Sequence, residues 1–318
     1  MIYEEFLQAE IRQGFHIRSM MKRVWACQIE ILEQVDRICR KHNIAYFADW
    51  GTLLGAVREK GYISWDDDLD IGMTRRNYEL FCQYAATELP EGYSLENSRF
   101  DMDEHTVKDV VVHIRDGESA CTEPGFLKRH YGCPYVICID LFVYDDIPDD
   151  PSEREVLLTL YTQIHKMTAV FGNDVIYKDC SEGEKSVIDG IESLLGFEIK
   201  RDKGIRQQLF LLLDYLSASY CAKGTKDIAV FGYLKSDPYR FIKREWVENI
   251  VYVPFEYSEI AIPTGYHDIL TKWYGEDYMV PKQGLGADHS YPYYRSQEKR
   301  LKQAYEKRGE EMPKEFLE

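Results

Sequence analysis

The sequence predicts an α/β fold of the α+β type, with a small mixed-sheet core in the first 150 residues that helices and a C-terminal hairpin surround. Three observations support this prediction. Apolar residues recur every three or four positions between residues 21 and 42, as on one face of a helix. Short apolar runs such as 136–143 have the length and β-branched content of strands. From residue 151 to about 220 the pattern is helical, with breaks at glycines.

The predicted elements follow one another closely along the chain. His42 and Asn43 end the leading helix, because the apolar repeat stops there. Strands are expected at 44–48, 69–73, 110–115 and 136–143, and short helices at 53–57 and 75–87. Further along, a hairpin is expected at 250–255 and 260–262, and helices at 266–274 and from 296. We expect a core at 1–150, a helical insertion at 151–225, and a C-terminal region at 226–318 that packs on the core and contributes to a substrate site.

The charge balance excludes some classes of partner. The chain has 39 Lys plus Arg and 55 Asp plus Glu, a formal net charge of −16. Without a basic surface, neither nucleic-acid binding nor a polybasic membrane site is expected. No apolar run approaches the roughly 20 residues of a membrane span, and the first ten residues do not resemble a signal peptide. We therefore expect a cytoplasmic protein with no integral membrane segment, whose 8 Cys are reduced thiols.

The segment 66–71, Asp-Asp-Asp-Leu-Asp-Ile, carries the most informative pattern. On a strand, Asp68 and Asp70 point to the same side and both reach one cation, with Asp66 just before the strand as a third ligand. Such a run is otherwise a solvated acidic turn. Because apolar residues alternate with the acids, the pattern favours a half-buried strand, in which a bound cation offsets the repulsion between carboxylates.

The pattern also restricts which cation binds. Asp66, Asp68 and Asp70 occupy the first, third and fifth positions of a calcium-binding EF-hand loop, but Ile71 and Asn77 stand where that loop needs Gly and Glu. Oxygen ligands that leave room for a substrate phosphate favour Mg²⁺ or Mn²⁺. A zinc site would have to combine residues whose spacing matches no common pattern: Cys121, His130, Cys133 and Cys138.

Two further segments place polar groups where a phosphate or a metal would bind. Gly51 and Thr52 form a turn between a strand and a helix, where backbone N–H groups attract anions, although many such turns only cap a helix. Asp140 lies inside an apolar strand, which is costly unless the carboxylate is paired or binds a metal. Asp145 and Asp146, beyond it, are expected in solvent. The chain has no Walker A, GxGxxG, GxSxG or HExxH motif.

The stretch from Asp49 to Met73 resembles the LicD family of phosphocholine transferases, which is related to the fukutin proteins and belongs to the nucleotidyltransferase superfamily. The resemblance continues through HIRDGESACTEP and CIDLFVYD to FEYSEIAIPTGYHDILTKWYGEDYM, with a variable helical middle. One departure is Ser64, where the family often has Pro. The resemblance implies a nucleotidyltransferase-like core at residues 1–150.

The resemblance also implies an activity. It implies a Mg²⁺-dependent (or Mn²⁺-dependent) phosphotransferase that moves phosphocholine, or a similar group, from a CDP-linked donor to a hydroxyl of a cell-surface glycan and releases CMP. By motif position, the metal ligands are expected to be Asp66, Asp68, Asp70 and, as the third superfamily carboxylate, Asp140. Catalytic roles fall to Asp68, Asp70 and Asp140. Substrate-binding roles fall to Gly51, Thr52, Arg58, Trp65 and Arg115.

Several alternatives stay open at this point. Arg58 reaches a phosphate or forms a surface ion pair, and His113 faces the site or is structural. A choline cation would need aromatic faces, for which the candidates are Trp50, Trp65, Tyr291, Tyr293 and Tyr294, although most such rings pack in a core. The alternative functions are a true nucleotidyltransferase, which transfers NMP from an NTP, and a non-catalytic glycan-binding or assembly protein.

Overall fold

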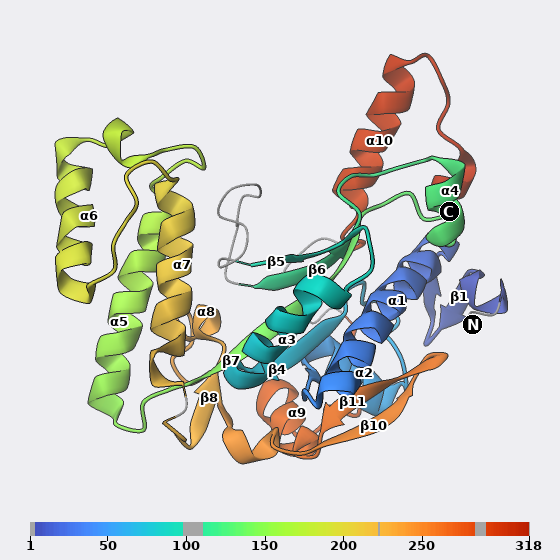
Figure 1. The fold of residues 1–318 in the computed structure, drawn as a ribbon. Helices are drawn as coiled ribbons and strands as arrows, with labels where there is room; N and C mark the ends of the chain where they lie inside the picture. The colour runs from blue at the N-terminus through green and yellow to red at the C-terminus, as the bar shows by residue number, and fades with distance from the viewer. Residues whose placement is uncertain (1–3, 98–110, 222, 284–290, 318) are drawn as a thin grey trace.

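The computed structural model describes residues 4–97, 111–221, 223–283 and 291–317. A seven-stranded mixed sheet lies at its centre, with strand order β3-β4-β7-β6-β5, and β8 and β9 continue from β7 (Figure 1). These strands are β3 (Phe47–Ala48), β4 (Asp70–Thr74), β5 (Tyr93–Glu96), β6 (Val112–Asp116), β7 (Ile137–Asp146), β8 (Asp227–Ala229) and β9 (Ile242–Lys243). The predicted α/β fold with a mixed sheet is therefore confirmed.

Helices and two hairpins surround this sheet. The hairpins are β1 (Glu10–Arg12) with β2 (Phe15–Ile17), and β10 (Ile250–Phe255) with β11 (Ser258–Pro263). The helices are α1 (Ser19–His42), α2 (Trp50–Arg58), α3 (Arg75–Glu88), α4 (Pro124–Arg129), α5 (Pro151–Thr168), α6 (Glu182–Leu195), α7 (Ile205–Ser217), α8 (Phe231–Leu234), α9 (Tyr266–Tyr274) and α10 (Arg295–Lys307). The predicted strand at 110–115 corresponds to β6, and residue 110 lies outside the described residues.

The register of two central strands positions the acids. β4 is parallel to β7, and Asp70 is the partner of Asp140. Partner residues on neighbouring strands project their side chains to the same face of the sheet. Two carboxylates from distant parts of the sequence thus emerge side by side.

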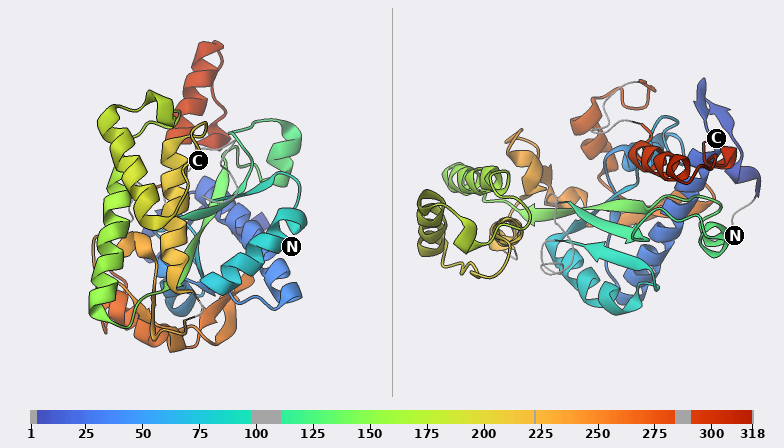
Figure 2. Two further views of the ribbon diagram at one scale, coloured as in Figure 1. Left: turned by 60° about the vertical axis from the view of Figure 1, so that its left-hand side comes forward. Right: turned by 90° about the horizontal axis from the view of Figure 1, so that it is seen from above.

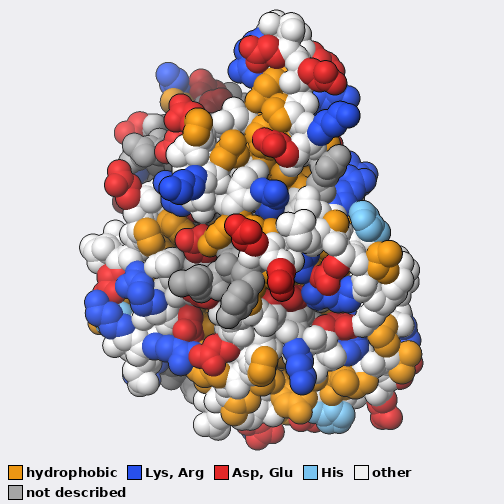
Figure 3. Space-filling view, turned by 90° about the vertical axis from the view of Figure 1, so that its right-hand side faces the viewer, with side chains coloured by type: hydrophobic (Ala, Val, Ile, Leu, Met, Phe, Trp, Pro, Cys, Tyr) orange, Lys and Arg blue, Asp and Glu red, His pale blue; other side chains and the backbone are white. Residues whose placement is uncertain are grey.

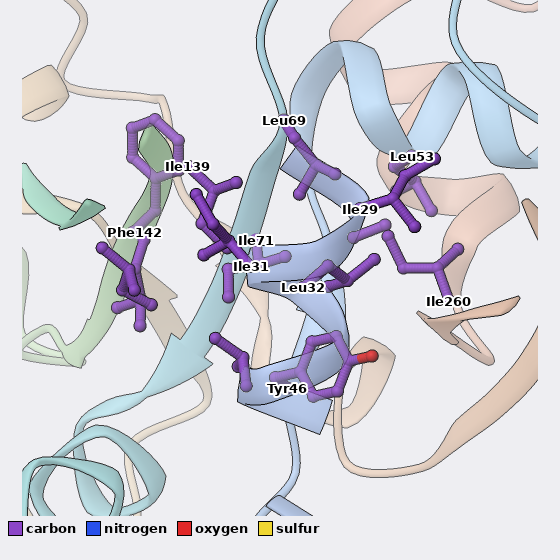
Figure 4. Packing of buried hydrophobic residues seen from close by; sticks show 14 of the residues in the cluster. Ile29, Ile31, Leu32, Tyr46, Leu53, Leu69, Ile71, Ile139, Phe142 and Ile260 are labelled. Carbon is purple, nitrogen blue, oxygen red and sulfur yellow. The ribbon is translucent and has the colours of Figure 1, made fainter. Parts of the chain in front are cut away.

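The long helix α1 fills the main core. Its buried side chains include Ile29, Ile31 and Leu32, which belong to one hydrophobic cluster with Leu69 and Ile71 (Figure 4). α1 and α3 cover one side of the sheet, as Figures 1 and 2 show. Because β4 and β7 are fixed from this side by apolar packing, the side chains of Asp70 and Asp140 are held in place on the other.

A second hydrophobic cluster unites α5 and α7 with α8 beside the far end of β7, and in Figure 1 the helices α5, α6 and α7 stand together as a separate layer. A buried ion pair joins this layer to the sheet. Arg75 donates to both oxygens of Asp145 at 2.6 and 2.8 Å and to Asp214 of α7 at 2.8 Å. Asp146 is also buried, and it accepts a hydrogen bond of 3.0 Å from the Thr225 hydroxyl.

The prediction that Asp145 and Asp146 lie in solvent is therefore wrong. The reason is tertiary: β8 pairs with β7 at these two residues, and α7 approaches from the helical layer. Their charges are balanced by Arg75 and Arg244.

On the face shown in Figure 3, acidic and basic side chains are interspersed, with apolar side chains between them. Within the described ranges, every helix is too short or too polar to cross a membrane.

Candidate functional site

A cavity of about 330 Å³ lies beside β4 and β7, where α2, α8 and α9 meet the sheet. Segments far apart in the sequence contribute to its wall. The lining residues are Trp50, Gly51, Leu54, Arg58, Ile63, Trp65, Asp66, Asp68, Asp70, Asp140, Phe142, Tyr233, Arg240, Trp273, Tyr274, Tyr278, Val280 and Lys282. The cavity thus brings together all four acids that the sequence singled out.

The four carboxylates reach the cavity from three positions in the fold. Asp70 begins β4 and is buried, and Asp140 lies beside it on β7 with its side chain 29% exposed. Asp66 and Asp68 precede the strand, and one carboxylate oxygen from each of Asp66, Asp67 and Asp68 lies within 4.8 Å of the others. Asp68 therefore lies in the irregular segment before β4, whereas the sequence placed it on the strand.

The acids disfavour one another's ionisation. Burial raises the pKa of Asp70 well above its usual value, and the charges of Asp68, Asp140 and Asp66 raise it further. Burial and then Asp68 raise the pKa of Asp66 in the same way. Such a cluster is costly as a set of ionised groups unless a cation neutralises it. The all-oxygen donor set, open to a cavity, fits a hard divalent cation such as Mg²⁺ or Mn²⁺.

Asp67, in the middle of the acidic run, has a different environment. It is fully buried and does not line the cavity. Its carboxylate accepts a hydrogen bond from the Tyr293 backbone N–H, and its carbonyl accepts one of 3.0 Å from the Gln28 side chain. Asp67 therefore fastens the acidic turn to α1 and to the C-terminal segment.

The turn at the start of α2 holds the acids in position. Gly51 lies against Asp66 so closely that a Cβ at this position would overlap the Asp66 carboxylate. The buried Thr52 does not line the cavity, and its hydroxyl accepts the Asp70 backbone N–H at 2.8 Å. Asp49 caps the helix at the Trp50 N–H, 2.9 Å away, and burial raises the pKa of its carboxyl to about 6.

The remaining predicted substrate-binding residues divide into two groups. Arg58 and Trp65 line the cavity, and Arg58 donates to the Tyr278 carbonyl at 3.1 Å and to Glu59 at 2.7 Å. Arg115 does not line it, and instead forms an ion pair of 2.8 Å with Glu96 across β5 and β6. The structure thus brings Arg58 and Trp65 to the acids, and leaves Arg115 at the neighbouring strand pair.

A histidine adjoins the acid on β7. His113 Nδ1 lies 2.8 Å from Asp140 Oδ1, and Cys138 is close to both. The zinc grouping considered from the sequence does not assemble among the described residues, and His130 instead faces Asp116 at 2.8 Å. No disulfide joins any of the eight cysteines, all of which lie within the described residues.

The aromatic wall was only partly predicted. Trp50 and Trp65 line the cavity, but Tyr291, Tyr293 and Tyr294 do not. The Trp50 ring is stacked on Trp273 with a centroid distance of 5.5 Å, and it contacts Tyr233 edge-on at 5.2 Å.

Sequence reasoning missed several residues of this wall. They are Phe142, Tyr233, Arg240, Trp273, Tyr274, Tyr278 and Lys282. For Trp273, Tyr274 and Tyr278 a signal existed, because the family-like C-terminal segment contains them. Arg240 lies in no recognised motif.

The carboxylates predict a particular pH dependence of stability. Since their pKa values are raised in the folded protein, it binds protons more tightly than the unfolded chain, so metal-free stability should fall as pH rises through the raised pKa values. We expect the metal-free Asp70→Asn variant to melt about 2 °C or more above wild type near pH 8, with the difference shrinking toward pH 5. Thermal unfolding in EDTA across this range measures it; a variant less stable at high pH would contradict the repulsion.

Parts of the chain are similar to known proteins. Residues 43–123 match the family described as LicD/FKTN/FKRP, nucleotidyltransferase domain. The chain is 25% identical over 257 residues to the lipopolysaccharide cholinephosphotransferase LicD of Haemophilus influenzae, which covers 80% of this chain and 90% of that protein. It is also 34% identical over 87 residues to an uncharacterized protein of Rickettsia prowazekii, covering 26% of this chain and 32% of the relative. The matched family range contains the turn at Gly51 and the acids of 66–70, whereas Asp140 lies beyond it.

Proposed function

Because residues 43–123 place this chain in the LicD/FKTN/FKRP nucleotidyltransferase family, we propose that it is a Mg²⁺- or Mn²⁺-dependent phosphotransferase. It moves phosphocholine, or a similar phospho-substituent, from a CDP-linked donor to a hydroxyl of a cell-surface glycan such as lipopolysaccharide. The observation that carries the proposal is the gathering of four carboxylates in one cavity at the β4–β7 pair. The Haemophilus relative supports the choice of phosphocholine and of the acceptor.

The acids of the cavity are the groups that would hold the cation. Asp68, Asp70 and Asp140 present their carboxylates to the cavity, and Asp66 adds a fourth. When bound, Mg²⁺ supplies positive charge against the donor diphosphate and the departing CMP. The burial of Asp70 and the hydrogen bond from its backbone N–H to the Thr52 hydroxyl fix the backbone that carries this carboxylate before any substrate arrives.

The transfer itself is a displacement at phosphorus. The acceptor oxygen forms a bond to the distal phosphorus while the bond between that phosphorus and the bridging oxygen breaks, and CMP leaves with the electron pair. Asp140 takes the proton of the acceptor hydroxyl, and His113, 2.8 Å away, orients its carboxylate. The cavity walls place the two substrates and limit the access of water.

The test is an assay of the purified protein with Mg²⁺, CDP-choline and lipopolysaccharide acceptors. We expect CMP release that depends on the metal and on the acceptor, together with an acceptor mass increased by one phosphocholine. CDP-ribitol, CDP-glycerol and a CMP-linked phosphonate, supplied in parallel, identify the head group if choline is not the cargo.

Other outcomes separate the alternative functions. Release of pyrophosphate from an NTP, without CMP from any CDP-linked donor, would contradict the proposal and indicate a true nucleotidyltransferase. Glycan binding without metal binding and without turnover would indicate a non-catalytic protein.

A further inference from the structure

Three basic residues line the cavity, and they differ in their partners. Arg58 is paired with Glu59 at 2.7 Å, and Lys282 with Asp277 at 2.6 Å. Among the residues that the structure describes, no carboxylate lies within 4.0 Å of the Arg240 guanidinium, although acids are in excess in this chain and four of them line the same cavity.

Aromatic rings hold Arg240 instead. Its guanidinium carbon lies 4.4 Å from the centroid of Trp50, 4.9 Å from that of Tyr233 and 5.8 Å from that of Trp273. Trp50 also contacts both Tyr233 and Trp273, so the rings around the guanidinium are packed against one another. Contact with a ring face uses the π surface of a guanidinium and leaves the N–H groups in its plane able to donate. A guanidinium fixed in this way is suited to binding two oxygens of one phosphate.

We infer that Arg240 binds the diphosphate of the donor, as the basic counterpart of the acids that line the same cavity. This inference rests on the proposed function and names a residue that binds the donor in it. The donor needs both kinds of group: carboxylates hold a cation, but they repel phosphate oxygens directly. Within the described residues Arg240 forms no ion pair, although its charge acts at longer range on the buried Asp49 and lowers the pKa of that carboxyl against the larger effect of burial.

The same contacts bear on the head group. Arg240 already lies over the Trp50 ring, so this ring face is occupied by a guanidinium and is not open to a quaternary ammonium. Trp65 lines the cavity apart from this cluster and has its own edge-on contact with Phe15 at 6.3 Å. A choline group would therefore be bound nearer Trp65 than Trp50.

The test uses the full chain and three variants, Arg240→Met, Arg240→Lys and Arg129→Met. Arg129 is an exposed arginine that lies over Phe126, 5.6 Å from the ring centroid, and it does not line the cavity, so it controls for loss of a cation–π contact. Calorimetric titration with inorganic pyrophosphate in Mg²⁺ is the binding probe. Assays of CMP release give KM for the CDP-linked donor and kcat. Melting temperatures verify that each variant is folded.

We expect Arg240→Met to weaken pyrophosphate binding at least about tenfold and to raise the KM of the donor by a similar factor. Arg240→Lys should recover part of the affinity, because the charge remains but the planar fork is lost. Arg129→Met should bind as wild type does. Unchanged pyrophosphate affinity in folded Arg240→Met would overturn the inference while leaving the transfer intact. Arg240-dependent pyrophosphate binding without CMP release would support the inference and contradict the proposed transfer.

Discussion

Asn in place of Asp68 or Asp70 is expected to lower the rate of CMP release by about a thousandfold or more. Each substitution removes one negative charge and one anionic oxygen ligand from the cavity, and keeps the size of the side chain. Asp70 carries the larger expected effect, because it is buried and its register partner is Asp140. The measurement is kcat/KM for a CDP-linked donor at saturating Mg²⁺.

Asp67→Asn is the matched control for these variants. It changes a neighbouring acid of the same run that is buried and does not line the cavity, and whose carboxylate accepts the Tyr293 backbone N–H. An amide oxygen can still accept that bond. We expect activity within about twofold of wild type and, at most, a lower melting temperature. Equal losses of activity in Asp67→Asn, Asp68→Asn and Asp70→Asn would mean that these acids stabilise the fold and do not bind the metal.

Gly51→Ala is expected to lower activity by about a hundredfold, through misplacement of an acid. A Cβ at this position would overlap the Asp66 carboxylate, so this side chain or the start of α2 has to move. Thr52, the next residue, holds Asp70 by its hydroxyl, and a shift of the helix start would reach that acid as well. The measurement is kcat/KM together with Mg²⁺ affinity, both of which should decline.

Gly190→Ala provides the comparison for this change. Gly190 also lies within a helix, α6, but a Cβ there would meet no atom within 4 Å. Alanine at such a helical position should be neutral or stabilising by up to about 1 kcal/mol, with activity unchanged. Wild-type activity in Gly51→Ala would contradict the close placement of Asp66 against the α2 turn.

The sequence predicted the acidic part of the site because its signal is local. Alternation of acids and apolar residues after Asp66 indicated that Asp68 and Asp70 serve one site, and both line the cavity. Asp140 was found because an acid in an apolar strand is costly. Its partnership with Asp70 was beyond prediction, since the parallel register of β4 and β7 depends on contacts distant in sequence.

There is a physical reason why the aromatic and basic residues of the cavity wall could not be predicted from the sequence. The helix at 266–274 was predicted and is α9, but periodicity does not reveal which neighbour each of its faces meets. Trp273 and Arg240 reach the cavity only because the C-terminal region folds back over α2. The wrong prediction for Asp145 has the same cause, because its partner Arg75 is 70 positions away in the sequence.

Manganese binding, measured by electron paramagnetic resonance in wild type and in Asp70→Asn, tests the central claim that the four acids form a divalent-cation site. Free Mn²⁺ gives a strong signal that is lost when the ion is bound, so a titration reports both affinity and stoichiometry. We predict saturable binding by wild type, competition by Mg²⁺, and binding at least about tenfold weaker in folded Asp70→Asn. Equal Mn²⁺ affinity in the two proteins, or no saturable binding in wild type, would contradict the account.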